Sequence, residues 1–179
     1  MREYIALVCI IVSCFGCKEN IALHESYWGD ATARVGDRWV DYFPLAVETT
    51  LVENRIIVEV DNFNAGNIRR RRIAFYKVPS AIGYHELSNT GPRDIDTLTG
   101  AYYQLFLGDG DVLGDTYYPN FGDDVEDYIE ITRIEGDQIW GKFQLSLYRR
   151  DKDLGPSPYG EPDYLTITGG EFHTRIWMP

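Results

Sequence analysis

A two-residue alternation of apolar and polar side chains is the feature that most constrains how this chain can fold. Its clearest example is residues 138–148, where every second residue is apolar or glycine. These residues are Ile139, Gly141, Phe143, Leu145 and Leu147. Residues two apart share one face of a β-strand, whereas a helix repeats every 3.6 residues. No segment of ten or more residues carries a helical stripe, so the sequence predicts an all-β fold.

Further strands are predicted wherever the alternation recurs between turn residues. They cover residues 31–35, 38–42, 55–61, 72–78, 101–107, 127–134, 163–168 and 170–177. Gly36 and Gly136 mark hairpin turns, and residues 168–171 are expected to form another, because glycine adopts positive φ without strain. Loops are expected at 108–126, rich in Gly and Asp, and at 154–162, rich in Pro and Gly. Short strands at this spacing predict a single antiparallel β-sandwich or β-barrel.

The start of the chain predicts an export signal. Arg2 precedes an uncharged, mostly apolar run at residues 4–13. A run of 7–15 apolar residues behind a basic residue is typical of a secretory signal, whereas a membrane span needs about 20. The segment Ile11-Val12-Ser13-Cys14 resembles the bacterial lipobox, in which the cysteine thiol is lipidated.

Cys17 is a second candidate for lipidation, because Lys18-Glu19 resembles the short charged export signal of Bacteroidota surface lipoproteins. We expect a lipoprotein signal at 1–16 with cleavage before Cys14 or Cys17, a tether at 17–30 and a β domain at 31–179. Two or three acyl chains, palmitate among them, would hold such a domain firmly at a membrane. No cysteine follows Cys17, so no disulfide is expected in the β domain.

The strands between residues 125 and 177 repeat a pattern of Ile, Thr, Gly and Phe. The positions are Ile129, Ile131, Thr132, Ile139, Gly141, Phe143, Ile167, Thr168, Gly170 and Phe172. This pattern resembles the small, uncharacterised, β-rich lipoproteins of Bacteroidota. The resemblance implies a lipocalin-like barrel or a sandwich, anchored at the outer membrane of a Gram-negative bacterium. It implies no activity and no catalytic residues.

The net charge of the chain limits the classes of partner that it can bind. The net charge of −11 argues against nucleic acid, which requires clustered Lys and Arg. The acidic loop offers Asp109, Asp111 and Asp115 as oxygen ligands for calcium. An EF-hand is rejected, because Leu113 and Asn120 occupy positions that need oxygen donors or Glu. The alternative is a solvated loop that keeps an exported protein soluble, and no cofactor is expected.

Two other groups are candidate binding residues. Tyr117, Tyr118 and Phe121 lie in the expected loop, where aromatic rings are available to stack on a sugar or line a pocket mouth. Residues 69–72 are four consecutive arginines, able to hold an anionic headgroup, a phosphate or an acidic glycan. The alternative for the arginines is a polar turn that pairs with the abundant acids.

Catalysis has little support in the sequence. The three histidines, His24, His85 and His173, lie far apart and lack zinc-site spacing. No nucleophile elbow or phosphate loop is present. The sequence therefore favours a non-catalytic binding or structural module for a small apolar ligand, a glycan or a protein partner. A glycan hydrolase that uses a carboxylate pair is the alternative.

Overall fold

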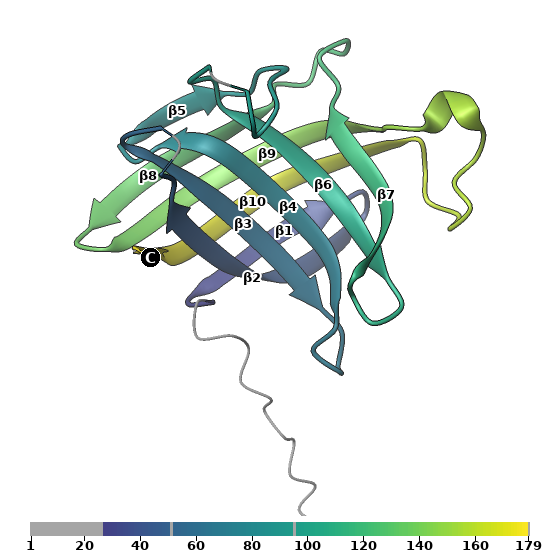
Figure 1. The fold of residues 1–179 in the computed structure, drawn as a ribbon, viewed down its shortest axis with the longest axis horizontal. Helices are drawn as coiled ribbons and strands as arrows, with labels where there is room; N and C mark the ends of the chain where they lie inside the picture. Colours follow the sequence, from purple (N-terminus) through teal and green to yellow (C-terminus); the bar gives the residue numbers. More distant parts are fainter. Residues whose placement is uncertain (1–26, 51, 95, 179) are drawn as a thin grey trace, which may run out of the picture.

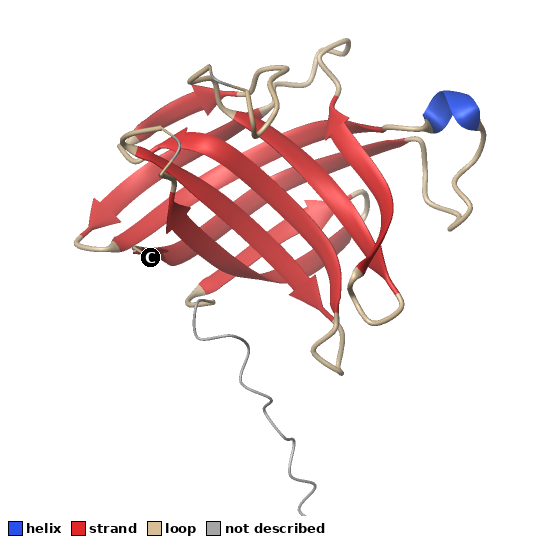
Figure 2. Ribbon diagram, in the orientation of Figure 1, coloured by secondary structure: helices blue, strands red, loops and turns tan. Residues whose placement is uncertain are grey.

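The computed structural model describes residues 27–50, 52–94 and 96–178. Within these residues the chain forms ten strands and one short 3-10 turn, Lys152–Leu154 (Figure 2). The described part contains no helix that is long and apolar enough to cross a bilayer. The expected signal, both candidate lipidation cysteines and most of the expected tether lie outside the described residues.

The strands are labelled in chain order. They are β1 (Asp30–Val35), β2 (Arg38–Glu48), β3 (Arg55–Phe63), β4 (Arg69–Pro79), β5 (Gly83–Glu86), β6 (Gly100–Leu107), β7 (Val112–Pro119), β8 (Tyr128–Glu135), β9 (Gln138–Arg149) and β10 (Tyr164–Trp177).

Eight of the strands close into an antiparallel β-barrel (Figure 1). The ring runs β1, β2, β3, β4, β6, β7, β9 and β10, and β10 returns to pair with β1. A short parallel contact also joins β10 to β2, where Ile176 lies opposite Ala46. The remaining strands extend the sheet, because β8 pairs with β9 and β5 pairs with β8. The predicted all-β fold is confirmed, as a barrel rather than a sandwich.

Side chains fill the interior of the barrel. Its largest fully buried members include Tyr103, Tyr117, Phe75 and Phe143, each at most 2% exposed. The inward residues of β9 are the ones that the alternation predicts, from Ile139 to Leu147. An eight-stranded barrel is narrow enough for side chains to fill it completely. The described interior of the barrel is therefore a hydrophobic core.

Two strands continue through positions where the sequence predicts that a strand ends. The turn expected at residues 168–171 is instead a bulge within the continuous strand β10, where Gly169 has φ +58°. Pro44 also lies inside a strand, since β2 continues to Glu48. On that side β2 pairs with β1 only up to Tyr42 and with β10 only from Ala46. The missing N–H of proline is tolerated in this gap in the ladder.

The expected loop at 108–126 contains strand β7, and the four arginines belong to β4 rather than to a turn. Acidic residues and glycine disfavour strands locally, but β7 is held by pairing with β6 and β9. The predicted loop at 154–162 does connect β9 to β10.

Two reciprocal glycine–phenylalanine pairs join β9 to β10. Gly141 lies opposite Phe172, and Gly170 lies opposite Phe143. A Cβ placed on Gly141 would be 2.4 Å from the Phe172 ring, and one on Gly170 would be 2.5 Å from the Phe143 ring. Each glycine therefore leaves the space that the phenylalanine directly opposite it occupies. This packing explains why Gly and Phe recur together in the repeated motif.

Strand β9 pairs with two different strands along one edge, and an acidic side chain joins the two regions. Strand β8 pairs with β9 as far as Gln144 of β9, and the pairing of β7 with β9 begins at Leu147 of β9. Between them, the Ser146 N–H donates to Asp127 Oδ1 (2.5 Å), and the Ser146 hydroxyl donates to Asp123 Oδ2 (2.5 Å). Burial raises the pKa of Asp127 to about 6. Part of the acidic segment therefore has a structural role and is not simply solvated.

We predict that Gly141→Ala destabilises the barrel by about 1–3 kcal/mol, because the added methyl group overpacks the Phe172 ring. The midpoint of urea unfolding measures this loss. Gly122→Ala is the matched control, since a Cβ there meets nothing closer than 3.6 Å. Equal midpoints for the two variants would contradict the proposed packing.

Candidate binding site at the barrel mouth

One end of the barrel contains a hollow of about 410 Å³ with a mixed polar and apolar lining, which we call the mouth. It lies where β3 ends, β4 begins and β6 ends, at the lower right of the barrel in Figure 1. The β9–β10 loop supplies the remaining wall. The lining residues are Asn62, Arg70, Arg71, Leu105, Phe106, Leu107, Tyr159 and Glu161.

Arg71 is the inward-facing cation of the mouth. It lies two residues before Ile73, which is fully buried in the core, and opposite Asn62 on β3 and Leu105 on β6. Residues directly opposite one another on neighbouring strands share a face, so Arg71 points toward the barrel interior. Arg71 is only half-buried, because it lies near the beginning of β4, where the barrel interior opens to solvent.

A buried tyrosine hydroxyl lies near Arg71. Tyr42 of β2 belongs to the core and is 3% exposed. Its hydroxyl oxygen has no hydrogen-bond partner among the described residues. Burial raises the pKa of Tyr42, and the positive charge of Arg71 opposes that rise. An unsatisfied buried hydroxyl costs about 1–3 kcal/mol.

Polar contacts from inside the barrel hold the β9–β10 loop over the mouth. The Ser157 hydroxyl donates to Asp115 Oδ2 (2.5 Å), and the Tyr117 hydroxyl donates to the Pro162 carbonyl (2.8 Å). Arg149 donates from Nε and Nη2 to Asp163 Oδ1, at 3.0 and 2.7 Å. These contacts place Tyr159 and Glu161, which lie between the fixed points, on the wall of the mouth.

The acids expected to bind calcium are separated by this arrangement. Asp109 and Asp111 are exposed at the β6–β7 turn, whereas Asp115 is buried within β7 and bonded to Ser157. In the described part of the chain, no group of three His, Cys, Asp or Glu side chains is arranged to hold a metal ion.

The three aromatic residues expected to contact a ligand also have different positions. Tyr117 is a core residue that holds the β9–β10 loop, and Tyr118 faces outward beside Tyr148, with ring centroids 6.4 Å apart. Phe121 is exposed in the following loop, 48% accessible. None of the three lines the mouth, where Tyr159 is the accessible aromatic residue.

The four arginines have separate partners, as expected for a strand that alternates faces. Arg72 donates from Nε and Nη2 to the fully buried Asp61, at 2.9 Å each, and also pairs with Glu59. Arg69 lies 3.8 Å from Asp61, and Arg70 donates to the Gly108 carbonyl. The expected pairing with acids is therefore confirmed for two of the arginines, and Arg71 is left facing the mouth.

The first described residues dock on the outer wall of the barrel. The Tyr27 hydroxyl donates to Asp61, and its ring meets Phe63 edge-on. Trp28 meets the His173 ring edge-on, and His173 in turn stacks on Trp140 with ring centroids 4.1 Å apart. The end of the expected tether is therefore fixed to the barrel.

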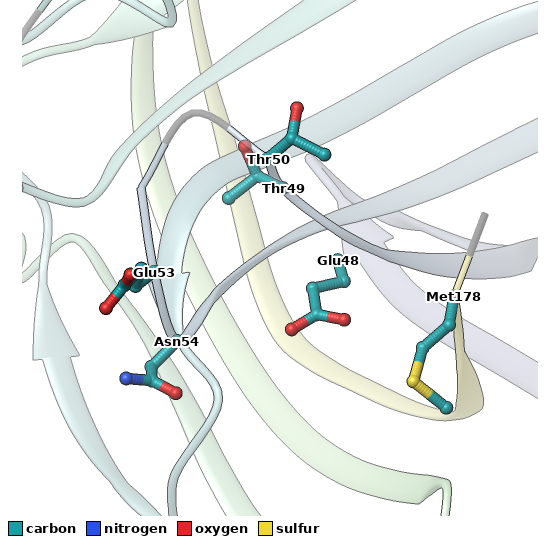
Figure 3. A pocket seen from close by; sticks show the side chains of 6 residues that line it. All are labelled: Glu48, Thr49, Thr50, Glu53, Asn54 and Met178. Atoms are coloured by element: carbon teal, nitrogen blue, oxygen red, sulfur yellow. The ribbon is translucent and has the colours of Figure 1, made fainter.

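Two further hollows lie away from the mouth. One, of about 190 Å³, lies outside β4 under residues 92–94 and includes Ile57 and Tyr76. The other, of about 380 Å³, contains Glu48 and Glu53 near Met178 (Figure 3). Both glutamates are exposed, and Glu53 points away from Glu48 in this view. A glycosidase acid needs a secluded carboxyl group facing its partner, so these two do not form a hydrolase site.

Sequence reasoning did not identify Asn62 or Glu161 as members of a site. No local signal marks Asn62 or Glu161, because long-range contacts bring them together.

Comparison with known proteins adds no relative. No protein family, curated protein or solved structure matches this chain.

We predict that Asp115→Ala releases the β9–β10 loop, because the buried Ser157 hydroxyl loses its acceptor at a cost of about 1–3 kcal/mol. Limited proteolysis with chymotrypsin should then cleave after Tyr159 several times faster than in the wild type. Asp111→Ala, at the exposed β6–β7 turn, is the control and should cleave at the wild-type rate. Equal rates for both variants would show that Asp115 does not hold the loop.

Proposed function

We propose that this chain is a lipid-anchored exported lipoprotein, held at the outer membrane of a Gram-negative bacterium through Cys14 or Cys17. Its β-barrel acts as a binding module without catalysing a reaction, and the mouth binds a glycan. The lipobox-like segment and the motif resemblance to Bacteroidota lipoproteins support the anchor.

One observation carries the binding half of this proposal: the barrel interior is filled, and its inward-facing polar side chains gather at the mouth. The buried Tyr and Phe side chains of the core favour a ligand at the mouth over an apolar ligand inside the barrel. The mouth instead combines amide, guanidinium and carboxylate groups with apolar side chains of β6. Sugars present hydroxyl groups together with apolar C–H faces, so this mixed lining suits them.

The accessible ring of Tyr159 adds a stacking surface. It is 48% exposed, and its backbone N–H donates to Ser157 Oγ (3.0 Å), which fixes its position in the loop. An aromatic ring held in place at low entropic cost is an effective contact for the C–H face of a sugar.

The anchor is tested by metabolic labelling with an alkyne-tagged fatty acid in a Gram-negative host. We expect the wild-type chain to be labelled and the Cys14→Ser/Cys17→Ser double variant to lose the label, because no other cysteine remains after the apolar run. The two single variants identify the lipidated residue. A labelled double variant would overturn the anchor.

Glycan binding is tested by applying the full-length protein, in detergent micelles, to an array of neutral and acidic glycans. We expect retention on at least one glycan class, weakened about tenfold or more by Tyr159→Ala because the stacking contact is lost. Tyr164→Ala is the matched control, since Tyr164 is 57% exposed and lies outside the mouth. Retention on no glycan would overturn this half of the proposal.

A further inference from the structure

The residues that line the mouth carry a net positive formal charge in a protein that is strongly acidic. Two arginines and one glutamate line the mouth, which gives a local charge of +1 against −11 for the whole chain. Charge of the opposite sign to the rest of the molecule selects anions near this point.

Arg71 is available to a ligand. Its guanidinium group forms no hydrogen bond or ion pair with any residue in the described part of the chain. The side chains of Arg69, Arg70 and Arg72 each have a protein partner. A guanidinium group presents a planar fork of donors that matches the two oxygens of a carboxylate. Its inward position, opposite Asn62 and Leu105, directs this fork into the hollow.

The other walls suit the body of a sugar. Leu105, Phe106 and Leu107 form an apolar side on β6, and Tyr159 presents its ring from the loop. Glu161 accepts hydrogen bonds from hydroxyl groups, and its negative charge disfavours a ligand that carries two charges, such as phosphate.

We propose that the mouth binds the carboxylate of a uronic-acid residue in an acidic glycan, with Arg71 as its counter-ion. This assignment rests on the proposed glycan-binding function and names the class of sugar. The carboxylate lies at the inner end of the hollow, and the sugar ring lies between the β6 side chains and Tyr159.

The test is isothermal titration of the full-length protein in micelles. The probes are trigalacturonate, a hyaluronan tetrasaccharide, the methyl ester of each, neutral maltotriose and sodium acetate. We expect at least one uronate probe to bind, and its methyl ester to bind at least tenfold more weakly, because esterification removes the charge that Arg71 recognises.

Variants identify the residues. Arg71→Gln should weaken uronate binding at least tenfold and leave ester binding unchanged, and Arg150→Gln controls for net charge at an exposed site outside the mouth.

The remaining outcomes separate the two proposals. Equal binding of ester and acid, or of maltotriose and uronate, would overturn the uronate assignment while glycan binding stands. Acetate binding as tightly as uronate would mean that the mouth holds an adventitious ion only. Failure of both uronates on a protein that the array shows to bind other glycans would overturn the uronate assignment alone.

Discussion

The filled interior of the eight-stranded barrel is the constraint on which the rest of this structure depends. Tyr103, Tyr117, Phe75 and Phe143 occupy the space that a wider barrel would leave for a ligand. Burial of apolar surface on this scale is the main source of folding free energy for a domain with no cysteine after Cys17. Because side chains pack the interior, the polar side chains available to a ligand lie at the mouth, where strands begin and end.

Closure of the barrel depends on small features at the strand contacts. The reciprocal pairs of Gly141 with Phe172 and Gly170 with Phe143 let two large rings pack between β9 and β10. Asp127 caps the Ser146 N–H in the interval where β9 passes from β8 to β7. These contacts let β9 serve as the strand that connects the closed ring to the extra strands β8 and β5.

The mouth follows from closure because its parts come from distant segments. Asp115 and Tyr117 face inward from β7, and their contacts with Ser157 and Pro162 turn the β9–β10 loop across the barrel end. Residues that the sequence marked for calcium and ligand binding therefore build the support of the site, and the loop they hold supplies Tyr159 and Glu161. Rigid support of this kind lowers the entropic cost of binding.

The sequence by itself determined the strands and their inward faces, because apolar alternation is a local property that burial enforces. It predicted the inward residues of β9 correctly, together with the hairpin turns at Gly36 and Gly136. It missed β7 and the continuity of β10, because pairing with neighbouring strands overrides local acid and glycine signals. Only the tertiary structure decided that the sheet closes into a barrel and that residues of β3, β4, β6 and the β9–β10 loop come together at its mouth. Both outcomes depend on register between strands far apart in the chain, which no local pattern encodes.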